Sequence, residues 1–313
     1  MSTIYVLSPG LSTTVQDLGR EGFGPIGVSP SGAADPIALR LGNRLVLNAE
    51  NAAGLEMTLV GGTFSFPQGA TLALTGSNFG ATLDGSPLDM WTSVHAQPGQ
   101  TLSLGPTQSG ARCYLCVHGG IVVPLFLGSA STQLLSGLGG FEGRSLLKGD
   151  VLQIGSRAQS FRVRAIAPQV SQQLSRRENL RVTPGPQADW FSESSLHTFY
   201  AQNYRISEQS NRMGIRLESA AVAQHHDNRM ITEGVSLGAI QVPPEGSPII
   251  LFVEQQTTGG YPKVANVISA DLHRIGQLRP RDEIRFSEVT IETARSLLVE
   301  QEQLLSSKEI ILE

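Results

Sequence analysis

Hydrophobic and polar residues alternate in short runs along most of the chain, and glycine, proline, asparagine or aspartate separates the runs. An alternation with a period of two residues is typical of β-strands that bury one face. Runs that alternate in this way include Thr71–Thr75, Thr101–Leu104, Val151–Ile154 and Glu283–Phe286, while Cys113–Val117 and Ile249–Val253 are continuous apolar runs of β-type residues. The pattern therefore predicts a mainly β protein.

One motif recurs along the chain: a turn, then a polar residue, then an alternating strand. It covers Pro98–Leu104, Lys148–Ile154 and Pro280–Phe286, and the last two copies close the two halves of the chain. Asp84-Gly85 is a strong signal for a two-residue hairpin turn. We therefore predict two similar β-barrel units.

The segment Ser156–Asn179 has no clear hydrophobic period and contains several polar and basic residues. We interpret it as the linker between the two units. We expect the first β-barrel unit to span residues 1–165. The second is expected to span residues 175–313, including a C-terminal helix.

Helical spacing of apolar residues appears in a few places. Asp35 is a candidate N-cap ahead of Pro36, and apolar residues then recur at helical spacing up to Asn48. A second helix is predicted over residues 188–200, and a third begins at about residue 290 with an apolar stripe. The expected fold is therefore mainly β with a few short helices.

The composition bears on partners and on location. Charged residues make up 16% of the 313 residues, below the roughly 25% of typical soluble domains, and there are 34 glycines. Such a surface fits either a compact β protein with long turns or a chain partly covered by a partner. The net charge of −4 argues against nucleic acid or anionic lipid as the main ligand. We find no apolar stretch long enough to span a membrane, and the first residues read as a strand rather than a signal peptide. The expected location is therefore the cytoplasm.

Two catalytic motifs match in letters but not in context. Cys113 and Cys116 form a C-x-x-C within a strand-like run, where residues three apart point to opposite faces, so we interpret both as structural. Ser236 is the centre of a G-x-S-x-G. The residues after it, Ala239–Pro244, read as a strand ended by prolines, whereas a nucleophile elbow requires a helix there.

Metal and nucleotide motifs are also weak. The adjacent His225, His226 and Asp227 diverge in a strand or turn, so we interpret them as a solvated turn and predict no metal site. Gly137–Gly143 is rich in glycine but does not fit G-x-G-x-x-G, and the P-loop motif is absent. A nucleotide is therefore expected to bind elsewhere or on a partner.

Two segments are denser in polar function than β-turns require. In the first, Gln16, Asp17 and Arg20 lie close together in sequence, and an arginine fork either recognises a carboxylate or holds a loop rigid. In the second, Asn211 offers an amide donor and acceptor suited to a lactam or ureido group, and Arg212 follows it. Both segments are candidate binding sites, although an ion pair that pins the N-terminal segment is an equally good interpretation of the first.

A third segment combines Thr258, Gly259, Gly260, Tyr261 and Lys263. Consecutive glycines leave backbone N–H groups accessible, and here they adjoin a hydroxyl, a phenol and a cation. This combination is a candidate cradle for an anion or a developing oxyanion. Taken alone, the segment also fits an inert loop.

Together, these segments resemble one protein family. The matching segments, in order, are Thr14–Arg20, Ser31–Asp35, Gly139–Arg144, Pro184–Pro186, Ser210–Gly214, Gly238–Pro243 and Gln256–Pro262. The family contains the C subunits of bacterial ATP-dependent 5-oxoprolinases, the allophanate hydrolase subunit 2-like proteins and the biotin-dependent carboxyltransferase domain of urea carboxylase. The resemblance spans nearly the whole chain, from about Ile4 to Phe286. It implies a pair of cyclophilin-like β-barrels and a direct complex with the B subunit of 5-oxoprolinase.

The resemblance also implies a reaction. The lactam of 5-oxoproline is opened to L-glutamate while ATP is cleaved to ADP and phosphate, and a further subunit, A, is required. We assign Asn211 to the N–C=O group, Thr258, Gly259 and Gly260 to the oxyanion, and Tyr261 to the shape of the pocket. The remaining candidates, which organise the site or bind the substrate, are Gln16, Asp17, Arg20, Arg212 and Lys263.

Two other functions use the same resemblance. One is a biotin-dependent carboxyltransferase component that acts on urea or a similar amide, with biotin as the cofactor. The other is a regulatory antagonist that binds a kinase inhibitor homologous to the B subunit. The sequence departs from the family at Glu254, where an aspartate is expected, at Arg281, where a Gly-Asp turn is usual, and at Ser236, where the family tends to carry an aliphatic residue.

Overall fold

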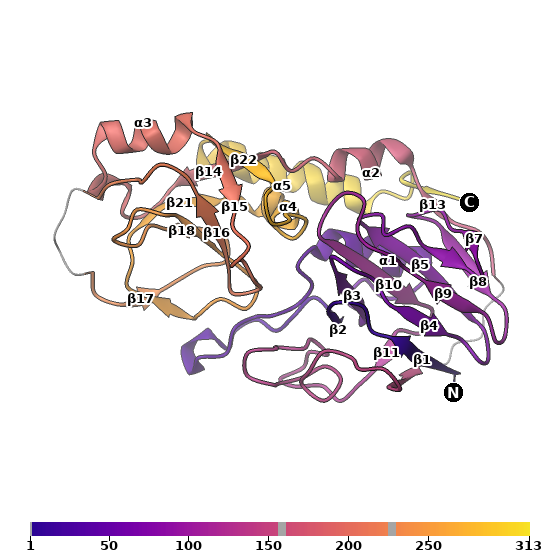
Figure 1. The fold of residues 1–313 in the computed structure, drawn as a ribbon. Helices are drawn as coiled ribbons and strands as arrows, with labels where there is room; N and C mark the ends of the chain where they lie inside the picture. Colours follow the sequence, from indigo (N-terminus) through magenta and orange to yellow (C-terminus); the bar gives the residue numbers. More distant parts are fainter. Residues whose placement is uncertain (1, 156–160, 225–229) are drawn as a thin grey trace. The chain divides into compact units, whose positions relative to one another are not determined.

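The computed structural model describes residues 2–155, 161–224 and 230–313, so His225, His226 and Asp227 lie outside the described residues. The chain divides into two compact units (Figure 1). Unit 1 comprises residues 1–20, 31–175 and 307–313, and unit 2 comprises residues 21–30 and 176–306. Residues 21–30 and 307–313 therefore belong to the unit opposite in sequence.

Unit 1 contains a seven-stranded sheet. Its strands, in spatial order, are β11 (Ile121–Val122), β12 (Val151–Ile154), β1 (Ser2–Ser8), β4 (Thr63–Ser65), β9 (Thr101–Ser103), β6 (Thr82–Leu83) and β7 (Ser86–Pro87). The predicted hairpin at Asp84-Gly85 joins β6 to β7, with Thr82 paired to Pro87. Both turn residues have positive φ, 48° and 82°, as this tight turn requires.

The second sheet of unit 1 has five antiparallel strands. In spatial order they are β2 (Thr13–Gln16), β3 (Gly54–Thr58), β10 (Arg112–Val117), β5 (Ala70–Gly76) and β8 (Ser93–Ala96). Apolar side chains from both sheets form one buried cluster that includes Ile4, Leu55, Phe64 and Leu115. Each sheet therefore supplies one buried face, which is what the period-two pattern predicted.

Cys113 and Cys116 lie on the fully buried strand β10 and are free thiols. Burial raises the pKa of both thiols far above the usual range, so they remain protonated and act as small apolar side chains. Their structural interpretation agrees with this placement.

Helix α1 (Pro36–Leu45) begins where the sequence predicted. The Asp35 side chain accepts a hydrogen bond from the Ala38 N–H at 3.0 Å and caps the helix, while Pro36 occupies the first turn. The apolar face of α1 packs on β5 and β10. Gly42 allows this close approach, because a Cβ there would lie 2.7 Å from the Cys116 sulfur.

The segment 156–179, interpreted as the linker between the units, contains regular structure in its described part. Strand β13 (Ala165–Ile166) pairs with β23 (Ile311–Leu312) near the end of the chain, and helix α2 (Pro168–Leu174) follows it. Strand β13 was not predicted, because it depends on a partner strand far away in sequence. Helix α2 buries only Val170, so it has no apolar stripe to detect.

Unit 2 is built on a closed barrel of seven strands. In order around the barrel they are β14 (Asn179–Pro184), β21 (Lys263–Val267), β18 (Ala239–Gln241), β19 (Ile249–Leu251), β16 (Gly214–Glu218), β15 (Tyr204–Ile206) and β22 (Glu283–Glu288). Closure comes from the parallel pairing of β14 with β22. Phe199, Tyr204 and Phe286 pack together in this unit, and the rings of Phe199 and Phe286 stack with centroids 4.9 Å apart.

Short helices and one two-stranded ribbon complete unit 2. The helix predicted over residues 188–200 is split, because Ser192 caps a new helix by accepting from the Ser195 N–H at 3.1 Å. The elements are β17 (Glu233–Gly234), β20 (Thr258–Gly259), α3 (Glu193–Ala201), α4 (Leu272–Ile275), α5 (Ile291–Ser306) and the 3-10 turns η1 (Gly24–Ile26), η2 (Ala188–Trp190) and η3 (Ser269–Asp271). The prediction of a mainly β chain with a few short helices is confirmed. No helix in the described part of the chain has the length and apolar character needed to cross a membrane.

Candidate functional site

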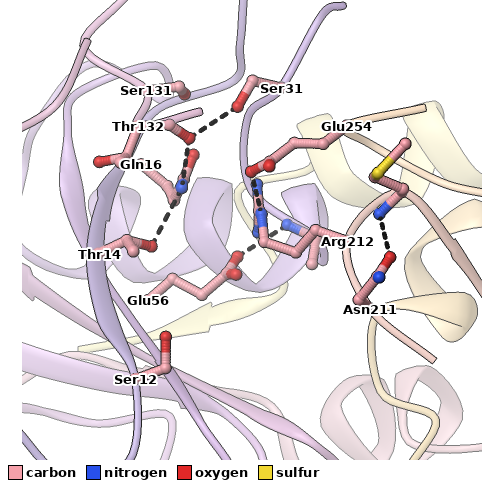
Figure 2. A network of polar contacts seen from close by, with 12 residues as sticks. Ser12, Thr14, Gln16, Ser31, Glu56, Ser131, Thr132, Asn211, Arg212 and Glu254 are labelled. Carbon is pink, nitrogen blue, oxygen red and sulfur yellow. Dashed lines mark hydrogen bonds and ion pairs between the residues drawn. The ribbon is translucent and has the colours of Figure 1, made fainter. Parts of the chain in front are cut away.

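The candidate residues of unit 1 lie at the end of strand β2. Gln16 is fully buried, and its Nε2 donates to the Thr14 hydroxyl at 3.0 Å and to the Thr132 carbonyl at 3.1 Å. The Ser31 hydroxyl donates to the same carbonyl at 2.8 Å, as Figure 2 shows. The Gln16 Oε1 atom has no partner among the described residues. Gln16 therefore fastens segments that are far apart in sequence and retains one buried acceptor.

Asp17 binds the segment 129–131 rather than open solvent. Its carboxylate accepts from the Ser129 hydroxyl at 2.6 Å, from the Ala130 N–H at 2.6 Å and from the Ser131 hydroxyl at 2.5 Å. The Gly19 N–H donates to the same carboxylate at 2.8 Å. Asp17 is 8% exposed, and its carboxylate oxygens are occupied by protein donors. The structure therefore places Asp17 as an organising residue of the loop.

Arg20 is buried beside Asp17 in sequence but makes different contacts. Its guanidinium donates to the Ser131 carbonyl and lies over the Phe126 ring at 5.2 Å from the centroid. A Cβ at Gly139, in the glycine-rich motif, would lie 2.9 Å from the guanidinium, so glycine is required for the close approach. Arg20 and the motif 139–144 are thus parts of one packed loop cluster.

Glu56 is a buried residue of unit 1 that the sequence analysis did not select. Its carboxylate accepts from the Ala34 N–H at 2.8 Å and from the Tyr114 hydroxyl at 2.7 Å, and Arg112 lies 3.6 Å away. Burial, followed by the Glu56 charge, raises the pKa of Tyr114 well above its usual value. The Tyr114 hydroxyl also accepts from the Asp35 N–H at 2.7 Å. These buried groups hold the Ser31–Asp35 motif in place, and a lone glutamate in an apolar strand was the available signal.

In unit 2, Arg212 is paired with Glu254. The Arg212 Nε atom lies 2.5 Å from the Glu254 carboxylate, and the Glu254 N–H donates to the Arg212 carbonyl at 2.8 Å (Figure 2). The Glu254 side chain is 3% exposed and that of Arg212 is 10% exposed. Glu254, which departs from the family pattern, is therefore the counter-ion of a candidate site residue.

Asn211 lies next to this pair in an exposed turn. Its side-chain oxygen accepts from the Met213 N–H at 2.8 Å and from the Gly214 N–H at 3.3 Å. The Asn211 N–H donates to the Gly214 carbonyl at 3.1 Å. The side-chain oxygen is thus used within the turn, and the amide nitrogen is the part that remains to contact a ligand.

The two adjacent glycines of the third segment differ in their surroundings. A Cβ at Gly259 would overlap the Gln241 Nε2 atom and lie 3.1 Å from the Val235 side chain. At Gly260, the nearest atom would be the Thr232 hydroxyl at 3.5 Å, which is an ordinary contact. A side chain at Gly259 therefore fits only if Gln241 shifts, whereas Gly260 is exposed and has room for a side chain.

Lys263 is a buried cation at the start of β21. Its side chain is 4% exposed and forms an ion pair with Glu233 on the ribbon strand β17, whose side chain is 45% exposed. Gln187 contacts both residues: its Oε1 accepts from the Lys263 N–H at 3.2 Å, and its Nε2 donates to the Glu233 carboxylate at 3.1 Å. Lys263 holds the pKa of Glu233 below its usual range.

Gln241 lies directly opposite Lys263 in the pairing of β18 with β21. The Gln241 side chain is 2% exposed, and its Nε2 atom has no hydrogen-bond partner among the described residues. Lys263 was predicted from the sequence as a site residue, whereas Glu233 and Gln241 were not. Gln241 does lie inside the matched segment Gly238–Pro243, so that motif was the signal. Glu233 is distant in sequence and carried none.

The remaining candidates have simpler environments. Thr258 and Tyr261 are exposed on the same segment, Tyr261 at 42%. Ser236 precedes strand β18 rather than a helix, which agrees with the rejection of a nucleophile elbow. No cluster of three or more metal-binding side chains occurs among the residues that the structure describes.

Comparison with known proteins identifies the family. The model of the "Carboxyltransferase domain, subdomain A and B" matches residues 26–288. The chain is 39% identical to the C subunit of the 5-oxoprolinase of Escherichia coli over 96% of both chains. It is 37% identical to the Haemophilus influenzae protein of the same name over 94% of both chains.

A solved structure agrees with this result. The crystal structure of the Kluyveromyces lactis urea amidolyase contains a region that matches with a TM-score of 0.91 and 32% identity. That match covers 99% of this chain but only 21% of the longer one. Since the family model covers most of the chain and the full-length relatives exceed 30% identity, the chain belongs to the carboxyltransferase domain family with subdomains A and B.

Proposed function

We propose that this chain is the C subunit of an ATP-dependent 5-oxoprolinase that opens the lactam of 5-oxoproline to L-glutamate, and that it acts in the cytoplasm in a complex with subunits A and B. The observation that carries the proposal is the 39% identity to the C subunit of the E. coli 5-oxoprolinase over 96% of both chains. A match over both full lengths supports the same task better than a match to one region of a larger protein.

The proposed chemistry explains why ATP is consumed. A lactam carbonyl is a poor electrophile, and transfer of the γ-phosphoryl group to its oxygen releases ADP and makes the ring carbon open to attack by water. Addition of one water to this carbon and cleavage of the C–N bond open the ring to the acyl phosphate of glutamate. A second water then hydrolyses the acyl phosphate to glutamate and phosphate, so each turnover consumes two waters. We assign ATP to the complex and not to particular residues of this chain.

Residues of unit 2 suit the recognition steps. The Asn211 amide nitrogen is available for the carbonyl of the N–C=O group, because its oxygen is used by the Met213 N–H. In our proposal, Thr258, Gly259 and Gly260 line the developing oxyanion, and Tyr261 shapes the pocket beside them. Arg212 binds a carboxylate only in competition with Glu254, so we assign it a positioning role.

In unit 1, the contacts of Gln16, Asp17 and Arg20 favour organising roles over direct binding. Asp17 and Arg20 are committed to the segment 129–131. The buried Gln16 Oε1 is an acceptor that suits an N–H donor of a ligand. We therefore propose Gln16 as a ligand contact within unit 1, with Asp17 and Arg20 as its support.

Reconstitution tests this function. Purified subunits A and B and this chain are mixed with ATP and 5-oxoproline, and glutamate and ADP are measured. We expect both products from the full mixture and neither product above background when any one subunit is omitted. A full mixture of folded subunits that forms no glutamate would contradict the proposal.

A second candidate rests on the K. lactis urea amidolyase structure and its TM-score of 0.91. Under this alternative, the chain is the carboxyltransferase component of a biotin-dependent enzyme that acts on urea or a similar amide. The biotin-bearing domain and the biotin carboxylase would then lie on separate proteins. Urea-dependent consumption of a carboxybiotin donor, without any requirement for 5-oxoproline, would favour this candidate.

A further inference from the structure

Lys263 is a buried cation whose counter-ion comes from an exposed segment. A buried ammonium requires an anion close by, because burial removes its hydration. Here the anion is Glu233, which is 45% exposed and lies on the two-residue strand β17. Strand β17 pairs only with β20 among the described strands. The anion on Lys263 is thus held by a short surface ribbon and not by the barrel wall.

Gln241 supplies a second unusual group at the same place. It is paired with Lys263 at a register shift between β18 and β21. Its Nε2 atom lies against Gly259, and Gly259 pairs with Glu233, which holds Lys263. The Gln241 Nε2 atom is buried and unpartnered among the described residues, although buried amide donors are nearly always satisfied. Gly259 lies against this atom, and any larger residue there would overlap it. The barrel therefore presents a cation and an unused donor side by side.

We propose that Lys263 and Gln241 form a subsite for a ligand that carries a carboxylate near an amide-type carbonyl. The ligand carboxylate replaces Glu233 on the Lys263 ammonium, and the ligand carbonyl accepts the hydrogen bond that Gln241 Nε2 lacks. This inference rests on the proposed function, since 5-oxoproline carries both groups on one small ring. Glu233 is then a resident counter-ion that occupies the carboxylate position when no ligand is bound.

Two features make the exchange physically reasonable. Glu233 is already half in solvent, so water can hydrate its carboxylate after displacement, whereas Lys263 always retains an anion. The Gln187 Nε2 atom donates to the Glu233 carboxylate, and the Gln187 Oε1 atom accepts from the Lys263 N–H, which fixes the amide in place. The same Gln187 donor is positioned for an incoming carboxylate. The exchange therefore replaces one set of charge-assisted contacts with an equivalent set.

Binding without turnover tests the subsite. Dissociation constants are measured by calorimetry in the absence of ATP, for the full chain alone and in complex with subunits A and B. The probes are 5-oxoproline, 2-pyrrolidinone, which is the lactam without a carboxylate, and cyclopentanecarboxylate, which is a ring carboxylate without the lactam. We expect the wild-type protein to bind 5-oxoproline more tightly than either partial analogue.

Three variants separate the contributions. In Glu233→Gln, the competing anion is lost, so the dissociation constant of 5-oxoproline should fall about twofold to fivefold, the strength of a half-exposed ion pair. In Lys263→Met, 5-oxoproline should bind about 30-fold or more weakly, with no remaining preference over 2-pyrrolidinone. In Gln241→Met, both lactams should weaken while cyclopentanecarboxylate is unaffected. Lys308→Met, at an exposed lysine of unit 1, is the matched control and should bind all three probes as wild type does.

The outcomes distinguish this inference from the proposed function. The replacement of Glu233 by a ligand carboxylate is overturned if Glu233→Gln binds both carboxylate probes with unchanged or weaker affinity. It is also overturned if neither wild type nor Glu233→Gln binds a carboxylate probe. Thermal unfolding identifies any variant that fails to fold. In that event Glu233→Gln, which changes an exposed side chain, still decides. If the reconstituted complex forms no glutamate but Glu233→Gln tightens carboxylate binding, the subsite stands and the proposed function falls.

Discussion

The contrast between two adjacent glycines is the sharpest structural prediction, and Gly259→Ala is the perturbation. The backbone φ of Gly259 is not positive, so alanine is allowed there and gains about 0.4–1 kcal/mol by restricting the unfolded chain. Against this, the new methyl group overlaps Gln241 Nε2 and lies 3.1 Å from Val235 Cγ1 and 3.2 Å from Gln256 Nε2. Overpacking of this kind costs about 1–3 kcal/mol. The expected net loss of stability is therefore about 1 kcal/mol.

The functional effect of Gly259→Ala should be larger than this loss of stability. Ordinary contact with a methyl group requires about 3.5 Å, so the Gln241 amide must move by about 1 Å. Displacement of a positioning group by an ångström lowers turnover by up to about 100-fold, and we expect a loss of about tenfold or more. Gly260→Ala is the matched control, because alanine keeps the backbone N–H assigned to the oxyanion and its nearest neighbour lies at 3.5 Å, so its turnover should stay within about twofold of wild type.

Two measurements on the same preparations check this prediction. Urea denaturation of each chain gives the free energy of unfolding, and glutamate formation by the reconstituted complex gives turnover. If Gly259→Ala and Gly260→Ala lose the same activity, the packing argument is refuted. Full activity in Gly259→Ala would also refute it, because the Gln241 amide would then have no role that depends on its position.

Three further predictions concern stability. Arg212→Met removes the guanidinium from the Glu254 carboxylate, whose side chain is 3% exposed. The free energy of unfolding, measured in urea, should fall by about 3–5 kcal/mol. A loss below about 1 kcal/mol would show that the pair is dispensable. Burial lowers the pKa of His273 to about 4, from about 6.5 in the unfolded chain. Protonation of this histidine therefore favours the unfolded chain. The free energy of unfolding is highest above pH 6.5 and decreases by about 3 kcal/mol as the pH falls toward 4. His273→Leu should flatten that part of the stability curve measured by denaturation across pH, and an unchanged slope would contradict the assignment. Asp17→Asn leaves the Ser129 and Ser131 hydroxyls with a weaker acceptor and should cost about 2 kcal/mol or more in thermal unfolding, whereas a change under about 0.5 kcal/mol would show that the carboxylate is not needed.

Features that depend on a few neighbouring residues could be predicted from the sequence. The cap at Asp35 needs only the N–H three residues on, and the Asp84-Gly85 turn needs only its own backbone angles. The alternation of apolar residues located strands that bury one face, such as β12 and β22, because that pattern does not depend on which strand is the partner. The family was also recognised from ordered motifs, since these are read without knowledge of their contacts.

The roles of the candidate residues depended on pairings that no local pattern specifies. Arg212 meets Glu254 because β16 and β19 are neighbours in the barrel, and Lys263 meets Glu233 through the ribbon of β17 and β20. The strand β13 was missed for the same reason.

The sequence by itself thus determined the mainly β class, the local caps and turns, and the family. Only the tertiary structure decided which buried charges are paired and that Gln241 keeps an unused donor opposite Lys263, within the part of the chain that is described. The physical reason is that burial and charge pairing are set by strand neighbours far apart in the chain, whereas caps and turns are set within a few residues.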